Sequence, residues 1–126
     1  MRTASIVLPP EPSSARGCRR FLATTLEAWG LDGFADDAIL LLSELVTNAV
    51  LHGGTELEVR VELHGDLLRV AVHDGNPVLP SVRHYSMLSG TGRGLALVAS
   101  TARNWDAERL PQGGKRVWFE LEATGG

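Results

Sequence analysis

Three polar side chains recur at intervals of four residues in the segment ELVTNAVLHGG, which covers residues 44–54. On an α-helix, residues four apart differ by about 40° in direction, so Glu44, Asn48 and His52 would form one slanted polar row. A carboxylate can accept a proton from a hydroxyl or a water, and an amide oxygen is an adequate ligand for Mg²⁺. A single imidazole without a nearby cysteine is a poor zinc site. Three such different groups in register favour a functional site over a solvated helix edge.

Two turn-forming segments carry further groups that could hold a ligand. In HDGNP (residues 73–77), Asp74 ends an expected strand and can accept a hydrogen bond from an amine, although DG and NP are also ordinary turn dipeptides. The run SGTGRG (residues 89–94) leads into an expected helix, where backbone N–H groups can approach phosphate oxygens. Arg93 can add charge-assisted hydrogen bonds. The run lacks the end of a P-loop and does not follow a strand, as a dinucleotide fingerprint should.

Three helices are expected to position these groups. The first is predicted from Ser14 to Trp29, with Ser13 or Ser14 as N-cap and Gly30 as its stop. The second is predicted over residues 34–51, with acidic residues in its first turn and Gly53-Gly54 at its end. The third is predicted to start near Gly92 or Arg93. The expected core face of the second helix is Ala38, Leu41 or Leu42, Leu45 and Ala49, and that of the third is Leu95, Val98, Ala102 and Trp105.

Alternation of apolar and charged residues predicts the strands. ELEVRVEL and LLRVAVHD, joined by the turn His64-Gly65-Asp66, read as a hairpin, and the closing KRVWFELE alternates in the same way. One face of the sheet should therefore meet water and the other the helices. The segment 75–91 has no periodicity and is expected to be a functional loop. The predicted fold class is α/β (α+β): a two-layer sandwich of about three helices over a mixed, largely antiparallel sheet.

Composition restricts the classes of partner. The 126 residues predict a single domain over 1–126, with 44% hydrophobic and 21% charged residues, as in soluble proteins. A net charge of −3 gives no bulk attraction to nucleic acid or to an anionic membrane. The sequence has neither an apolar run of membrane-spanning length nor a signal peptide, so a cytoplasmic location is expected. Cys18 is expected to be a small buried apolar residue.

The order of these motifs adds to their individual meaning. E-x-x-x-N-A-x-x-H-G on a helix, D-G-x-P after a hairpin and G-x-G-R-G-L-A-L-V entering a helix follow one another. This arrangement resembles the histidine-kinase-like ATP-binding (Bergerat) fold shared by histidine kinases and DNA gyrase. More narrowly, it resembles the small anti-sigma-factor serine/threonine protein kinases, in particular the stand-alone actinobacterial type. The resemblance extends from the first helix through GGKRVWFEL.

The resemblance implies roles for individual positions. Glu44 would be the general base that activates a hydroxyl, Asn48 would hold Mg²⁺ bridging the phosphates of ATP, and Asp74 would accept from the exocyclic amine of adenine. Residues 78–91 would form the lid over the nucleotide. His52 would either shape the pocket wall or touch phosphate. The nucleotide-binding residues implied in this way are Asn48, His52, Asp74, Asn76, Gly90, Thr91, Gly92, Arg93, Gly94 and Leu95.

Two departures from the family pattern concern the base end of the site. The aspartate turn of the family reads D-x-G-x-G, whereas Asn76 and Val78 stand at the two glycine positions here. The last strand of the family often carries a threonine after G-x that helps to bind adenine, and the sequence pattern puts Arg116 in that place. Both departures predict altered contacts to the base.

The resemblance implies a protein kinase that sequesters a sigma factor and phosphorylates a serine or threonine of an anti-sigma factor antagonist. Such proteins usually act as homodimers and through protein partners, without direct contact to nucleic acid or membrane. The alternative is an ATP-binding interaction module without kinase activity, which the departures favour and the retained Glu44 opposes. The catalytic domain of a histidine kinase is disfavoured, because no dimerisation helices or phosphoacceptor segment precede it.

Overall fold

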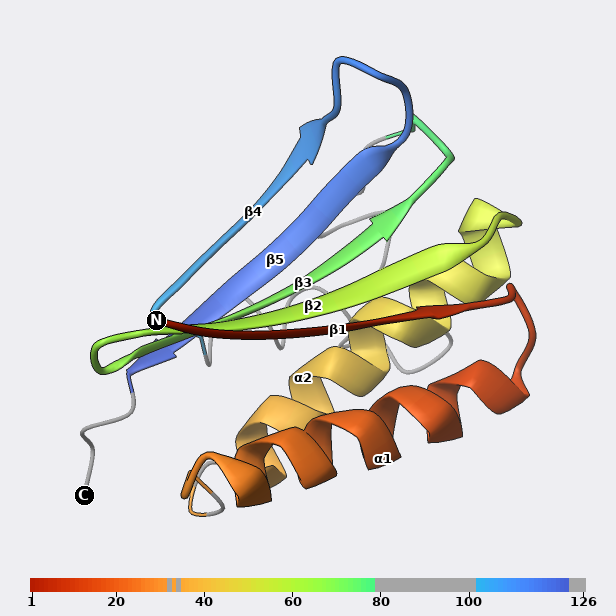
Figure 1. Cartoon of the computed structure of the whole chain (residues 1–126). Helices are drawn as coiled ribbons and strands as arrows, with labels where there is room; N and C mark the ends of the chain where they lie inside the picture. Colours follow the sequence, from red (N-terminus) through yellow and green to blue (C-terminus); the bar gives the residue numbers. More distant parts are fainter. Residues whose placement is uncertain (32, 34, 79–101, 123–126) are drawn as a thin grey trace.

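The computed structural model describes residues 1–31, 33, 35–78 and 102–122. Among these residues, a five-stranded sheet in the order β1-β2-β3-β5-β4 carries two helices on one face (Figure 1). All of its pairings are antiparallel. The elements are β1 (Arg2–Leu8), α1 (Ser13–Ala28), α2 (Ala35–Asn48), the π-helical turn η2 (Ala49–Gly53), β2 (Leu57–His64), β3 (Leu67–Asp74), β4 (Asn104–Arg109) and β5 (Lys115–Glu122). The α+β sandwich that the sequence predicts is therefore confirmed.

Helix α1 forms where the apolar spacing predicts it, but its start differs from the expectation. Neither Ser13 nor Ser14 caps the helix, because Pro12 is the N-cap residue. The Ser14 hydroxyl instead donates to the carbonyl of Pro9 (2.7 Å), which holds the proline-rich turn against the helix. At the other end, Gly30 adopts a left-handed backbone (φ 73°), as a helix stop requires.

Helix α2 ends earlier than the sequence predicts, because its last turn widens. The α-helix runs to Asn48, and residues 49–53 then form a π-helical turn that Gly54 terminates with a left-handed backbone (φ 68°). Asp36 and Asp37 lie in the first turn, as expected. A single π-helical turn often marks a functional site. The change begins directly after the predicted metal ligand.

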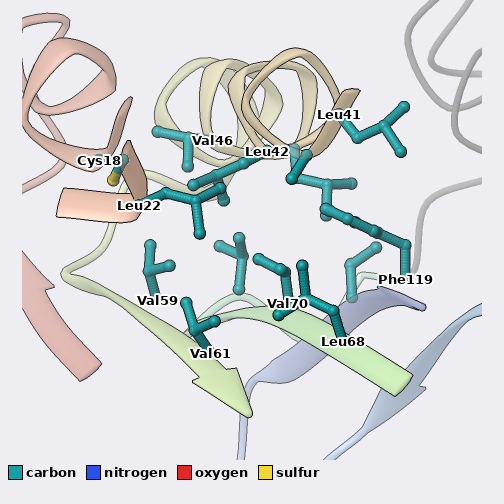
Figure 2. Close-up of a cluster of buried hydrophobic side chains, with 14 of the residues drawn as sticks. Cys18, Leu22, Leu41, Leu42, Val46, Val59, Val61, Leu68, Val70 and Phe119 are labelled. Carbon is teal, nitrogen blue, oxygen red and sulfur yellow. The ribbon is translucent and has the colours of Figure 1, made fainter. Parts of the chain in front are cut away.

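The core lies between the two helices and the inner face of the sheet. Figure 2 shows Leu22, Leu42 and Val46 from the helices opposite Val59, Val70 and Phe119 from the strands. Cys18 belongs to this cluster, and its burial raises the pKa of the thiol to about 11, so the thiol is unreactive at neutral pH. The core positions predicted for the second helix are confirmed, and the apolar residues that alternate along β2, β3 and β5 are buried as expected, except Leu63, which is partly buried. Trp29, at the predicted end of the first helix, is also only partly buried.

One predicted element is wrong in part. Trp105 was expected on the face of a third helix, but it lies on strand β4, opposite Phe119 of β5. The spacing of Val98, Ala102 and Trp105 fits a helix, whereas Trp105 and Ala107 also fit the two-residue period of a strand. Pairing with β5 decides for the strand. The start of the predicted third helix, near Gly92 or Arg93, lies outside the described residues.

Candidate functional site

The first candidate group is Asn48, the last residue of α2. Its side chain is buried, with 1% of the residue exposed. Neither the amide oxygen nor the amide nitrogen has a hydrogen-bond partner among the described residues. A buried polar group without a partner costs about 1–3 kcal/mol, so such groups are rare in folded proteins. An unpaired buried amide is the feature expected of a group that binds a ligand.

Glu44 lies one helical turn before Asn48 on the same helix and is half-buried. The relation between these two residues therefore agrees with the predicted row. The backbone at His52 belongs to the π-helical turn, in which each hydrogen bond spans one more residue than in an α-helix. The expected α-helical spacing is thus confirmed for Glu44 and Asn48.

The second candidate group is Asp74, the last residue of β3, which is buried. Lys115 begins β5 and stands directly opposite Asp74 in the register of the two strands. Its ammonium group donates to Asp74 Oδ1 (2.9 Å) and to the carbonyl of Asn76 (3.1 Å). The side chains of Lys115 and Asp74 are only 6% and 3% exposed, so they form a buried ion pair.

Arg116 is not in the position that the sequence pattern suggested. Successive residues of a strand point to opposite faces, so Lys115 shares the inner face with Asp74 and Arg116 points to the outer face. There the guanidinium of Arg116 pairs with Glu108 of β4. The residue beside the candidate base-binding carboxylate is therefore Lys115, and the expectation for Arg116 is wrong.

The segment after Asp74 is fixed by several hydrogen bonds. The backbone N–H of Asn76 donates to Asp74 Oδ1 (2.8 Å), and that of Val78 donates to Asn76 Oδ1 (2.9 Å). These are two successive turns, closed by the side chains of Asp74 and Asn76. Neither Asn76 nor Val78 has a positive φ, so the turns do not need glycine at these positions. The hydroxyl of Thr55 accepts from the N–H of Gly75 (2.7 Å).

Further contacts hold the same end of the sheet. Gly114 passes so close to Asp74 that a Cβ there would lie 2.2 Å from the Asp74 carbonyl oxygen. Its left-handed backbone (φ 81°) also favours glycine. Arg109 of β4 donates to the carbonyl of Pro77 (3.1 Å). The start of the loop after β3 is thus contacted by the residue Arg109 of β4 and by residues just before β2 and β5.

The two candidate groups lie at the same end of the molecule. Figure 1 shows α2, η2 and β3 running to one end, and both α2 and η2 contact β3. The amide of Asn48 and the ion-paired carboxylate of Asp74 thus stand at the ends of two elements, α2 and β3, that contact each other. The predicted phosphate-binding residues, which are Gly90, Thr91, Gly92, Arg93, Gly94 and Leu95, lie outside the described residues, as does most of the predicted lid.

The sequence interpretation missed Lys115, Thr55 and Arg109. The position of Lys115 could have been predicted from the sequence. Val117, Phe119 and Leu121 define an inner face of the strand, and the two-residue period extends this face back to position 115. Asp74 extends the inner face of β3 in the same way. Thr55 and Arg109 act through contacts with distant backbone groups, and no local pattern indicates these.

Comparison with known proteins identifies the class. The chain matches the model of the histidine kinase-like ATPase domain over residues 8–121, and it therefore belongs to that family. Membership implies that the domain binds ATP. No helix among the described residues is long and apolar enough to cross a membrane.

A solved structure supports the same fold. The chain is similar to the crystal structure of the RsbU and RsbW domains of Rv1364c from Mycobacterium tuberculosis, with a TM-score of 0.74 and 22% sequence identity. The match covers 97% of this chain and 32% of that one, so this chain spans about a third of the length of the chain that it matches. No curated protein matches the chain.

Proposed function

We propose that this protein is an ATP-binding regulator of the anti-sigma factor type, which phosphorylates a serine or threonine of a protein antagonist and sequesters a sigma factor. The observation that carries the proposal is the buried amide of Asn48, which has no hydrogen-bond partner among the described residues, in a domain of the histidine kinase-like ATPase family. The likeness to a structure that contains an RsbW domain supports the narrower assignment.

The residues present fit Mg²⁺ held jointly with nucleotide. The free amide oxygen of Asn48 is a hard, neutral ligand, and Mg²⁺ is commonly bound through one or two protein groups, substrate phosphates and waters. No group of three or more His, Cys, Asp or Glu among the described residues could hold a metal ion by itself. The metal would neutralise charge on the phosphates, and Asn48 would fix its place.

Glu44 is proposed as the general base. Its carboxylate, one turn from Asn48, would accept the proton of the antagonist's hydroxyl group. The hydroxyl oxygen forms a bond to the γ-phosphorus, the bond from this phosphorus to the bridging oxygen breaks, and ADP leaves. Catalysis then consists mainly of positioning and charge neutralisation. Asp74 is proposed to accept from the exocyclic amine of adenine, and Asn76 to shape the base end. His52 and the glycine-rich run 90–95 are proposed to lie near the phosphates.

Calorimetric titration with ATP tests the binding step. The wild type is expected to bind ATP with a dissociation constant below millimolar when Mg²⁺ is present and more weakly without it. Asn48→Ala should lose the part of the ATP affinity that depends on Mg²⁺. Thr47 is an exposed neighbour on the same helix, and Thr47→Ala should bind ATP as the wild type does. Absence of binding at millimolar ATP would overturn the proposed function.

A phosphoryl-transfer assay separates the kinase from the alternative. A small antagonist protein carrying the acceptor serine is incubated with labelled ATP and the protein. Glu44→Gln keeps the shape of the side chain and removes the base, so transfer should fall by about two to four orders of magnitude while ATP binding is retained. Equal transfer by Glu44→Gln and the wild type would contradict the assignment of Glu44.

The alternative is an ATP-binding interaction module without kinase activity. The ion pair of Asp74 with Lys115 favours it, because one oxygen of the candidate base-binding carboxylate is already occupied. Binding of ATP without transfer to any hydroxyl, by the wild type and Glu44→Gln alike, would establish this module instead of the kinase.

A further inference from the structure

The buried lysine at position 115 has no part in the function proposed above. Lysine is rarely buried without a partner, and here the ammonium group lies on the inner face of the sheet beside the carboxylate proposed to bind the base. The following inference rests on the proposed function, because it concerns the nucleotide preference of the same site.

The hydrogen bonds around Asp74 occupy its two oxygens unequally. Oδ1 accepts from the Lys115 ammonium (2.9 Å) and from the backbone N–H of Asn76 (2.8 Å). Oδ2 accepts a hydrogen bond from no described residue. Lys115 is also held by the carbonyl of Asn76 (3.1 Å), so the ammonium cannot move without breaking a second contact. The carboxylate is therefore fixed in rotation, with Oδ2 left to accept from a ligand.

A carboxylate oxygen that can only accept hydrogen bonds selects purines that carry a donor at the edge facing it. The exocyclic amine at position 6 of adenine donates to such an oxygen. Hypoxanthine carries an oxygen at that position, and it would place an acceptor against an acceptor. A site whose polar group is left unpaired by the wrong ligand rejects that ligand strongly.

Removal of the ammonium would weaken this discrimination. An unpaired carboxyl group at a buried position favours its neutral form. A neutral carboxyl group has one O–H donor and retains acceptor capacity, so it can bind the 6-oxo group as well as the 6-amino group. We infer that Lys115 is a positioning residue for nucleotide specificity: it holds Asp74 as a fixed acceptor and thereby selects 6-aminopurine over 6-oxopurine nucleotides.

The test compares ATP with inosine triphosphate by calorimetry, in Mg²⁺ and at one pH. The wild type should bind ATP more tightly than inosine triphosphate. Lys115→Met should reduce the ratio of the dissociation constant for inosine triphosphate to that for ATP by at least about tenfold. Arg116→Met is the matched control, since it removes the neighbouring cation on the opposite face of the strand. It should keep the wild-type ratio.

If Lys115 had a purely structural role, Lys115→Met would weaken the binding of both nucleotides equally and leave the ratio unchanged. That result would overturn this inference but not the proposed function. If Lys115→Met does not fold, the variant Asp74→Asn/Lys115→Met replaces the ion pair by neutral groups of similar volume. An asparagine can present either its oxygen or its nitrogen, so the ratio should fall close to one. A wild-type ratio in this variant would also overturn the inference. A wild type that binds neither nucleotide would overturn the proposed function and this inference with it.

Discussion

The two buried polar side chains of the candidate site, Asn48 and Asp74, differ in whether they have partners for hydrogen bonding and charge. Asn48 at the end of α2 has no hydrogen-bond partner among the described residues. Asp74 at the end of β3 is paired with a lysine, and the same oxygen also accepts a backbone N–H. Within the described part of the chain, one polar group therefore lacks a hydrogen-bond partner and the other has its own counter-charge.

This difference separates two kinds of contribution to a binding site. An unsatisfied amide lowers the stability of the free protein, and a ligand that pairs with it restores what was lost. A buried ion pair is instead part of the folded structure, and removal of one partner leaves an uncompensated charge. Substitutions at the two positions should consequently change stability with opposite sign.

The largest effect is expected from Lys115→Met. This change leaves the Asp74 carboxyl group buried without its counter-ion, so the free energy of unfolding should fall by about 3–5 kcal/mol. Urea denaturation measures it. The double variant Asp74→Leu/Lys115→Met removes both charges and should recover most of the loss. Equal destabilisation by the single and the double variant would show that the pair contributes through packing and not through charge.

Gly114→Ala should be the next most destabilising change, by roughly 2–4 kcal/mol, because the added Cβ would lie 2.2 Å from the Asp74 carbonyl oxygen on a left-handed backbone. Gly113→Ala is its matched control. Gly113 also has positive φ (105°), but a Cβ there would meet nothing within 4 Å. The difference between the two unfolding free energies isolates the close approach to Asp74. Equal values would mean that backbone strain alone is responsible.

The smallest effect concerns His73, which lies next to Asp74 but on the outer face. Burial lowers the pKa of His73 from 6.5, Glu58 acts in the opposite direction, and Arg116 adds to the lowering. Its Nε2 is buried and has no partner among the described residues. Below pH 6.5 the unfolded chain therefore binds a proton that the folded state resists, so stability falls as pH falls.

His73→Gln should make the unfolding free energy less dependent on pH between 7.5 and 5. Denaturation curves at several pH values measure this slope, and His64→Gln, at an exposed strand end, is the control for loss of a histidine. Identical slopes for the wild type and His73→Gln would contradict the role of burial at this position.

Most of the described fold could be predicted from the sequence because its periodicities are strong. The alternation in ELEVRVEL and LLRVAVHD fixes both the hairpin and its buried face, and the helical spacing of Cys18, Leu22 and Leu26 fixes α1. The prediction from the local pattern was wrong at Trp105, because the neighbouring apolar residues fit both a helical and a strand period. A long-range pairing with β5 decided that position, and a pairing partner cannot be read from a short window.

The positions of the candidate residues in the fold were predictable more than their contacts. Glu44 and Asn48 follow from helical spacing, and Asp74 from its place at a strand end. The ion pair with Lys115 depends on the register between β3 and β5, which sets two residues 41 positions apart opposite each other. A one-residue difference in register moves a side chain to the other face of the sheet, which is the error made for Arg116.

The central claim is that Asn48 is unpaired because it serves a ligand, and its most direct test is a set of four urea denaturation curves. The wild type and Asn48→Leu are each measured without and with saturating ATP and Mg²⁺. Without ligand, Asn48→Leu should be more stable than the wild type by about 1 kcal/mol, because an apolar side chain of similar size replaces an unsatisfied amide. With ligand at about 100 times the wild-type dissociation constant, the wild type should gain about 2.7 kcal/mol and Asn48→Leu much less, because it keeps only the weaker, Mg²⁺-independent binding. The order of stability would then reverse. If Asn48→Leu is the less stable protein without ligand, or if it gains as much from ATP and Mg²⁺ as the wild type does, Asn48 is a structural residue and the account is wrong.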